Sequence, residues 1–210
     1  MKLLALSDLH GDYSKVEAIK HRAGKIDAVL IAGDITNFGP DSDVYKLIGM
    51  FDVPILAIPG NCDHPSILET LEKSDAINLH KTCHAIGEVD FIGLGGSNTT
   101  PFNTMFEMTD QDIEKSLEDL FDKSRASRTV LLSHAPPRGY VDELPIGHVG
   151  SMSITKFIDR LSLIVCGHIH EARGLAKKGN TNIVNVGEAS KGYGALITIN
   201  DDICIEFIEV

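Results

Sequence analysis

Short apolar runs that each end in a polar cluster recur along the chain. The runs at 2–7, 28–33 and 54–59 predict buried strands. Apolar positions with helical spacing separate these runs, and Ser14 with Glu17 has the pattern of a capping box at the start of the first helix. Alternating strands and helices predict right-handed βαβ units and a largely parallel sheet in this half.

The remainder of the chain mixes helical spacing with period-two alternation, which is typical of antiparallel pairs. The predicted elements are a hairpin over 84–95 that turns near 87–90, a polar loop over 97–108, a helix from Thr109, a strand over 129–133, a helix that Ser151 can cap, a strand over 161–166, and a hairpin formed by 193–199 and 203–209.

Parallel units followed by antiparallel pairs predict an α/β fold in which two sheets pack face to face with helices outside. The chain has 210 residues, of which 43% are hydrophobic, and it contains neither an internal repeat nor a low-complexity tract. A chain of this size can bury about 70% of its unfolded surface in one core. We therefore expect a single domain over 1–210.

The acidic composition bears on the partners of the protein. A formal net charge of −11 repels the nucleic-acid backbone and anionic lipid, and no basic run reverses its sign. The apolar opening MKLLALS is interrupted by Asp8, and no other segment is long enough to span a membrane. We expect neither a nucleic-acid partner nor a membrane partner.

The four cysteines lack CxxC pairing and occupy apolar or motif positions. This usage is typical of reduced thiols and predicts a cytoplasmic location.

Polar clusters directly follow five of the apolar runs. In an open α/β sheet the carboxyl ends of the strands form the binding crevice, so these clusters are expected to converge. Aspartate, asparagine and histidine without a thiolate set suit borderline or hard divalent cations. The candidate ligands are Asp8, His10, Asp34, Asn61, His134, His168 and His170.

The spacing within these clusters supports metal binding. Asp8 and His10 are two residues apart, as are His168 and His170, so in extended backbone each pair points to one side and can address one ion. Asp34 is the natural carboxylate to bridge two cations. Two cations about 3.5 to 4 Å apart can clamp the attacking and leaving oxygens of a phosphoryl transfer.

The five ordered clusters resemble the motifs of the calcineurin-like metallophosphoesterase family, and the chain is most similar in length to its small single-domain bacterial and archaeal phosphodiesterase branch. The motifs appear here as Asp8-Leu9-His10, Gly33-Asp34 with Gly39, Gly60-Asn61-Cys62-Asp63, His134, and Gly167-His168-Ile169-His170.

This resemblance implies a four-layer α-β-β-α sandwich of two mixed sheets with flanking helices. It also implies two divalent metal ions, drawn from Mn, Fe, Zn, Ni or Co, and in-line attack of a metal-bridging hydroxide on a small phosphate ester. Phosphodiesters are favoured over monoesters. The implied ligands are Asp8, His10, Asp34 and His170 for one ion, and Asp34, Asn61, His134 and His168 for the other.

One residue departs from the family pattern. Many members carry histidine after the Gly-Asn pair, where it can protonate the leaving oxygen, whereas this chain has Cys62. A thiol is a poor general acid, so His64 and His148 are the alternative candidates and good leaving groups should be favoured. Asp63 is predicted to orient a ligand, with a simple turn residue as the equal alternative.

Two other functions stay open. Larger relatives with the same motifs act as DNA nucleases, although this acidic chain lacks their additional segments. A non-catalytic scaffold that retains the metal site is the second alternative. The physiological substrate, the native metals and the oligomeric state are left open.

Overall fold

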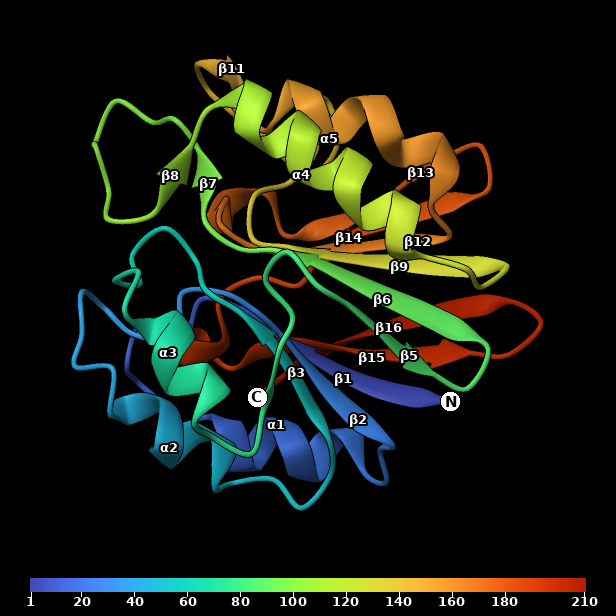
Figure 1. Cartoon of the computed structure of the whole chain (residues 1–210). Helices are drawn as coiled ribbons and strands as arrows, with labels where there is room; N and C mark the ends of the chain where they lie inside the picture. Colours follow the sequence, from blue (N-terminus) through green and yellow to red (C-terminus); the bar gives the residue numbers. More distant parts are fainter.

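The computed structural model describes residues 1–210 and consists of four layers (Figure 1). One six-stranded sheet is covered on its outer face by helices α1 (Val16–Ala23), α2 (Asp43–Ile48) and α3 (Ile67–Glu72). In spatial order its strands are β16 (Ile203–Glu209), β15 (Tyr193–Ile199), β1 (Lys2–Leu6), β2 (Ala28–Ala32), β3 (Ile55–Ile58) and β4 (Ile77–Asn78).

A second six-stranded sheet faces the first and is covered by α4 (Asp110–Lys123) and α5 (Met152–Phe157) (Figure 1). In spatial order its strands are β13 (Gly174–Lys178), β14 (Thr181–Asn185), β12 (Leu163–Cys166), β9 (Arg128–Ser133), β6 (Val89–Leu94) and β5 (Cys83–Ile86). Parallel and antiparallel pairs occur in both sheets. The α-β-β-α sandwich of two mixed sheets is therefore confirmed.

Apolar side chains fill the three spaces between the layers, and along each buried strand they point alternately to one face and the other. In β1, Leu4 and Leu6 pack against the first set of helices, whereas Leu3 and Ala5 face the opposite sheet. Successive side chains of a strand point to opposite faces, so a strand that is covered on both sides reads as a continuous apolar run. The third space, between the second sheet and its helices, holds residues such as Leu117.

Most of the expected elements form with the expected ends. The hairpin of β5 and β6 and the hairpin of β15 and β16 are present. Thr109 and Ser151 cap α4 and α5, because their hydroxyl oxygens accept the amides of Asp112 and Ile154. Polar loop 97–108 also contains one small pair, β7 (Ser97–Asn98) with β8 (Glu107–Met108).

Two features differ from the sequence expectations. The capping box of Ser14 and Glu17 is wrong: Lys15 is the N-cap of α1, and the Ser14 amide donates to the Asp12 carboxylate, a local turn that replaces the cap. The short helix α3, the edge strand β13 and its neighbour β14 were not predicted. Edge strand β13 alternates between exposed and half-buried positions, so it has no apolar run.

Candidate metal centre

The seven candidate ligands lie at the carboxyl ends of strands from both sheets, toward the left side in Figure 1. Asp8, Asp34 and Asn61 follow β1, β2 and β3 of the first sheet. His134 and His168 follow β9 and β12 of the second sheet. The site is therefore built where the two sheets meet, and each sheet supplies part of it.

Backbone strain is concentrated at these positions. Asp8, His10, Asp34 and His168 have left-handed φ angles of 54°, 49°, 49° and 69°. This conformation costs roughly 1 kcal/mol or more for a non-glycine residue and is retained where the surrounding structure enforces it.

Two motif glycines make room for the carboxylates. A Cβ added to Gly60 would lie 2.0 Å from an Asp34 carboxylate oxygen, and one added to Gly167 would lie 2.2 Å from an Asp8 carboxylate oxygen. Both carboxylates thus pack directly against backbone, which only glycine permits. The glycines of the Gly-Asn and Gly-His motifs are explained by this close approach.

Acceptor oxygens lie beside the outer ring nitrogens of two of the imidazoles. The Nδ1 of His134 lies 2.8 Å from the Ala32 carbonyl oxygen, and the Nδ1 of His170 lies 3.1 Å from the Glu188 carboxylate. A carbonyl or carboxylate oxygen can only accept, so the proton of each neutral ring belongs on Nδ1. Each Nε2 then presents a lone pair to the centre of the site.

These lone pairs face other acceptors. The Nε2 of His134 is 2.9 Å from the Asn61 amide oxygen and 3.4 Å from an Asp34 oxygen. The Nε2 of His170 is 3.1 Å from an Asp8 oxygen and 3.3 Å from the Nε2 of His10. Each Nε2 needs either a proton or a cation to meet these acceptors, so this set of carboxylate, amide and imidazole groups fits divalent metal ions.

The buried carboxylates stabilise positive charge on the groups around them. Burial raises the pKa of Asp34, but His134, His10 and the Cys62 amide outweigh it and hold that pKa below its ordinary value. Burial lowers the pKa of His134, but Asp34 and Asp8 raise it to about 9. Burial and the charge of His134 lower the pKa of His168 to about 4, which keeps that imidazole neutral.

The two oxygens of Asp34 face different imidazoles. One lies 3.8 Å from the Nε2 of His10 and the other 3.4 Å from that of His134. Ligand atoms of Asp8, His10 and His170 lie within 4.8 Å of one another, as do those of Asp8, Asp34 and His134. This arrangement is consistent with a bridging Asp34, and the division of ligands between two ions stays a prediction.

Asp63 connects the loops that carry two candidate ligands. Its buried carboxylate accepts the amides of Ile35, Thr36 and Gly60 at 3.0, 2.7 and 2.8 Å, together with the Thr36 hydroxyl. Burial and the charge of Asp34 raise its pKa to about 6. Asp63 thus fixes the Asp34 loop against the Asn61 loop.

His64 and His148 have no hydrogen bond or ion pair with the candidate ligands. His64 is exposed, and its Nδ1 lies 2.7 Å from the Ser66 hydroxyl. His148 is exposed on the hairpin of β10 (Glu143–Leu144) and β11 (Gly147–His148), and its Nδ1 lies 2.7 Å from the Asp142 carboxylate. Their role as general acids stays a prediction.

Glu188 was missed from the sequence. Its carboxylate lies 3.1 Å from the Nδ1 of His170 and pairs with Lys191 at 2.6 Å. A partial signal was present, since Gly187-Glu188 follows the segment 183–186, which is apolar except for Asn185, much as Gly33-Asp34 follows its strand.

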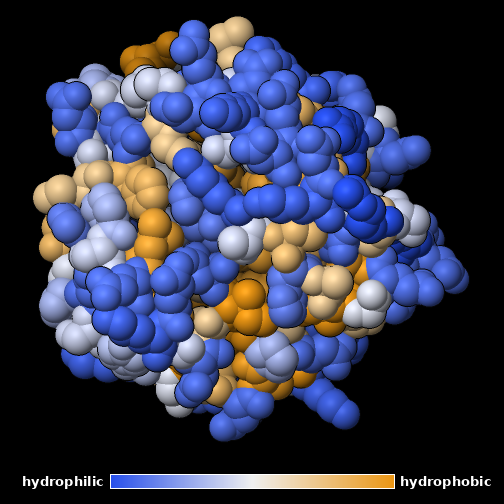
Figure 2. Space-filling view, viewed as in Figure 1, coloured by the Kyte–Doolittle hydropathy of each residue, from blue (hydrophilic) through white to orange (hydrophobic).

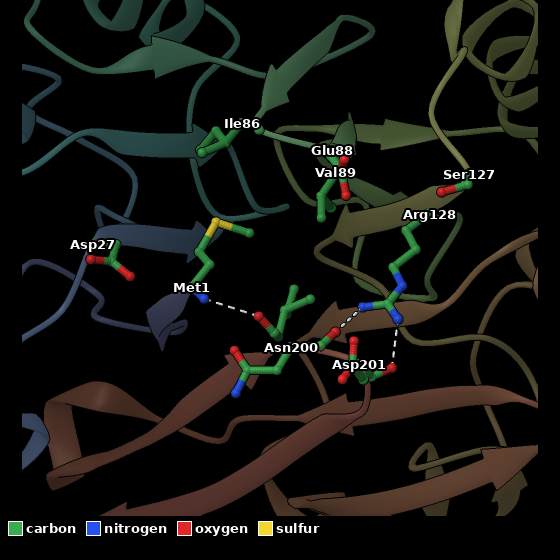
Figure 3. A pocket seen from close by; sticks show the side chains of 11 residues that line it. Met1, Asp27, Ile86, Glu88, Val89, Ser127, Arg128, Asn200 and Asp201 are labelled. Carbon is green, nitrogen blue, oxygen red and sulfur yellow. Dashed lines mark hydrogen bonds between the residues drawn. The ribbon is translucent and has the colours of Figure 1, made fainter.

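A cavity of about 760 Å³ lies at the opposite end of the strands (Figure 3). Met1 and Arg128 line it at the starts of β1 and β9. The Met1 ammonium donates to the Ile199 carbonyl, and Arg128 donates to the carbonyls of Asn200 and Asp201. These cations are satisfied by backbone, and none of the candidate ligands lines the cavity.

Comparison with known proteins bears on the fold and the family. An uncharacterized protein of Methanocaldococcus jannaschii is 37% identical over 195 residues, which cover 88% of this chain and 87% of that protein. A structure from Thermus thermophilus matches with a TM-score of 0.75 at 18% identity, covering 98% of this chain and 97% of that one. A dimetal phosphatase from Danio rerio matches with a TM-score of 0.66 at 11% identity, covering 100% and 96%.

No helix of the protein combines the length and apolar character needed to cross a membrane. The model of the calcineurin-like phosphoesterase family matches residues 1–172, a range that contains all seven candidate ligands. The chain therefore belongs to the calcineurin-like phosphoesterase family.

Proposed function

We propose that the chain is a metal-dependent phosphodiesterase that hydrolyses small phosphodiesters at the centre described above. The observation that carries the proposal is the convergence of carboxylate, amide and imidazole acceptors on one space, with the Nε2 of His134 2.9 Å from the Asn61 oxygen. Two divalent cations would supply Lewis acidity there and lower the pKa of a water nucleophile. The similar fold of a dimetal phosphatase from Danio rerio supports the count of two.

The protein residues position this chemistry. The Ala32 carbonyl beside the Nδ1 of His134 and the Glu188 carboxylate beside the Nδ1 of His170 favour the tautomer that leaves each Nε2 free for a cation. Burial, and next the charge of Asp34, raise the pKa of the Cys62 thiol above its ordinary value. A neutral thiol is a weak nucleophile, so we expect no covalent intermediate at Cys62.

The charge of the site favours a diester over a monoester. A phosphodiester carries one negative charge, whereas a monoester carries close to two at neutral pH. No lysine or arginine pairs with a candidate ligand, and Lys191 is already engaged by Glu188. The additional charge of a monoester would therefore have to be offset by the cations alone.

Metal reconstitution tests this function. Protein stripped with a chelator would receive Mn²⁺, Zn²⁺, Co²⁺, Ni²⁺ or Fe²⁺ and then bis(4-nitrophenyl) phosphate or 4-nitrophenyl phosphate. We expect metal-dependent hydrolysis with the diester preferred. Faster monoester turnover would contradict the preference for diesters. Absence of hydrolysis with every metal would contradict the proposed enzymatic activity.

Two controls separate the alternatives. A metal titration that detects binding without hydrolysis would favour a scaffold. Cleavage of plasmid DNA together with a steep salt dependence of DNA binding would favour a nuclease, because phosphate contacts release counterions.

A further inference from the structure

Phe38 combines two features that do not serve folding. Its φ is 62°, a left-handed value that disfavours a bulky side chain, and its side chain is 55% exposed although it is aromatic. Glycine at this position would be less strained. A strained, exposed aromatic residue contributes little to the core, and such outliers concentrate where a ligand is bound.

The backbone holds Phe38 beside the candidate metal centre. Its amide donates to the Cys62 carbonyl at 3.0 Å, and the Cys62 amide donates to an Asp34 carboxylate oxygen at 2.8 Å. On the preceding turn, Thr36 is bound to the buried Asp63 carboxylate. Phe38 is thus two hydrogen bonds from a candidate ligand, on a loop with a fixed conformation.

A second loop brings apolar side chains to the same segment. The Phe106 amide donates to the Asn61 carbonyl at 3.1 Å, which attaches the β7–β8 loop to the residue before Cys62. On this loop Phe102 is 81% exposed and Met105 51% exposed. In Figure 2 hydrophobic surface gathers at the left margin, near the β7–β8 loop and the loops after β2 and β3.

The β7–β8 loop is ordered around a carboxylate. Glu107 accepts the hydroxyls of Thr100 and Thr104, both at 2.6 Å, and their amides at 3.0 and 2.8 Å. The loop is therefore folded so that Phe102 and Met105 face outward. Conformational freedom of the loop does not account for their exposure.

We propose that Phe38, Phe102 and Met105 form an apolar rim that binds the organic group of the phosphate ester, and that the substrate carries a flat aromatic substituent such as a phenyl ring or a base. This inference rests on the proposed phosphodiesterase function. Both loops of the apolar rim are bonded to the Asn61–Cys62 segment, and Asn61 is a candidate ligand. An aromatic group on the rim would be attached to a phosphate at the metal centre.

Two diesters that share the same leaving group test this proposal. Phenyl 4-nitrophenyl phosphate and methyl 4-nitrophenyl phosphate release the same nitrophenolate and differ in the retained group. We expect the wild type to have the lower KM for the phenyl ester. In Phe38→Ala the KM for the phenyl ester should rise about five- to tenfold with little change in kcat, because stacking on an aromatic ring is lost. Phe38→Tyr should restore the preference.

Tyr45→Ala is the matched control, because Tyr45 is 48% exposed on α2, outside the apolar rim. Phe38→Gly separates binding from folding: it should lose the preference without lowering Tm, since glycine relieves the left-handed strain. Phe102→Ala provides a second variant on the other loop. An unchanged phenyl preference in both Phe38→Ala and Phe102→Ala would overturn the apolar rim while leaving the phosphodiesterase intact.

Failure of the underlying function has a different signature. Phenylphosphonate and methylphosphonate would be titrated into Mn²⁺-loaded wild-type protein, with tighter binding expected for the phenyl compound. Equal affinities would overturn the apolar rim alone. Absence of both binding and hydrolysis would overturn the phosphodiesterase, and the rim proposal with it.

Discussion

The two ends of the sandwich are formed by the same strands but use their polar groups differently. At the carboxyl ends, buried acceptors of Asp34, Asn61 and His134 face one another across 2.9 to 3.4 Å. At the opposite end, a cavity of about 760 Å³ is lined by charged groups whose donors are satisfied by carbonyls (Figure 3). The cations that line this cavity already have backbone partners, whereas the converging acceptors at the carboxyl ends form the candidate metal centre.

The largest expected effect comes from replacing one carboxylate at the candidate metal centre. The same replacement at the opposite end is the control. If the proposed metal centre is correct, Asp34→Asn should reduce kcat toward bis(4-nitrophenyl) phosphate by about 10³-fold, because a neutral amide binds cations more weakly than a carboxylate. Asp27→Asn, which lines the opposite cavity, should leave kcat unchanged. Metal analysis of both purified variants checks the cause. Wild-type metal content and kcat in Asp34→Asn would contradict the site.

Substitutions of Cys62 are expected to have the next largest effect on turnover. Replacing the thiol by an imidazole in Cys62→His should raise turnover of an alkyl phosphodiester relative to the nitrophenyl diester by about 10²-fold, since a general acid helps a poor leaving group most. Cys62→Ser should change both rates by less than about threefold, as expected for a residue that is no nucleophile. A large loss in Cys62→Ser would indicate covalent catalysis.

Glu188 tests whether the orientation of His170 matters. Glu188→Gln should weaken metal affinity by about 10- to 100-fold, measured by metal titration, while kcat at saturating metal changes little. Glu209→Gln is the control, because Glu209 is exposed and pairs with Arg173 at 3.7 Å away from the centre. Equal metal affinities in the two variants would show that Glu188 does not contribute to metal binding.

The smallest effect concerns stability at the apolar rim. Burial raises the pKa of Glu107, but the donors of Thr100 and Thr104 outweigh it and lower the pKa from 4.5 to about 2. A depressed carboxyl pKa adds stability that is present above pH 4.5 and is lost as the pH falls toward 2. After allowance for partial exposure, Glu107→Gln should reduce the free energy of unfolding by roughly 1 kcal/mol at pH 7.

Urea unfolding of wild type and Glu107→Gln at pH 7 and pH 3.5 measures this difference, which should narrow at the lower pH. Glu114→Gln, which breaks an exposed ion pair with Lys156, provides a comparison with little expected effect. A constant difference at both pH values would show that the charge of Glu107 is not what holds the loop.

The sequence predicted those parts of the molecule that are encoded locally. A strand covered on both faces, such as β1, is an apolar run, and the polar residue after it lies at the sheet end whatever the rest of the chain does. For this reason Asp8 and His134 could be placed together from a single sequence.

Features that depend on tertiary contacts could not be predicted in this way. The four donors around Asp63 come from two loops, and Glu188 reaches His170 across 18 positions of the chain. The left-handed backbone of Phe38 likewise depends on the loop around it. Edge strand β13 has one exposed face and no apolar run, so its pattern carries too little signal.

The division of the site between two sheets has a consequence for assembly of the protein. Asp34 and Asn61 belong to one sheet and His134 and His168 to the other, so a cation with ligands from both can bind fully only after the sheets have docked. By mass action such a cation stabilises the native state, by about 2.7 kcal/mol at a free concentration one hundred times its Kd. The metal supply of the cell would then influence how long the folded protein survives, in addition to how fast it works.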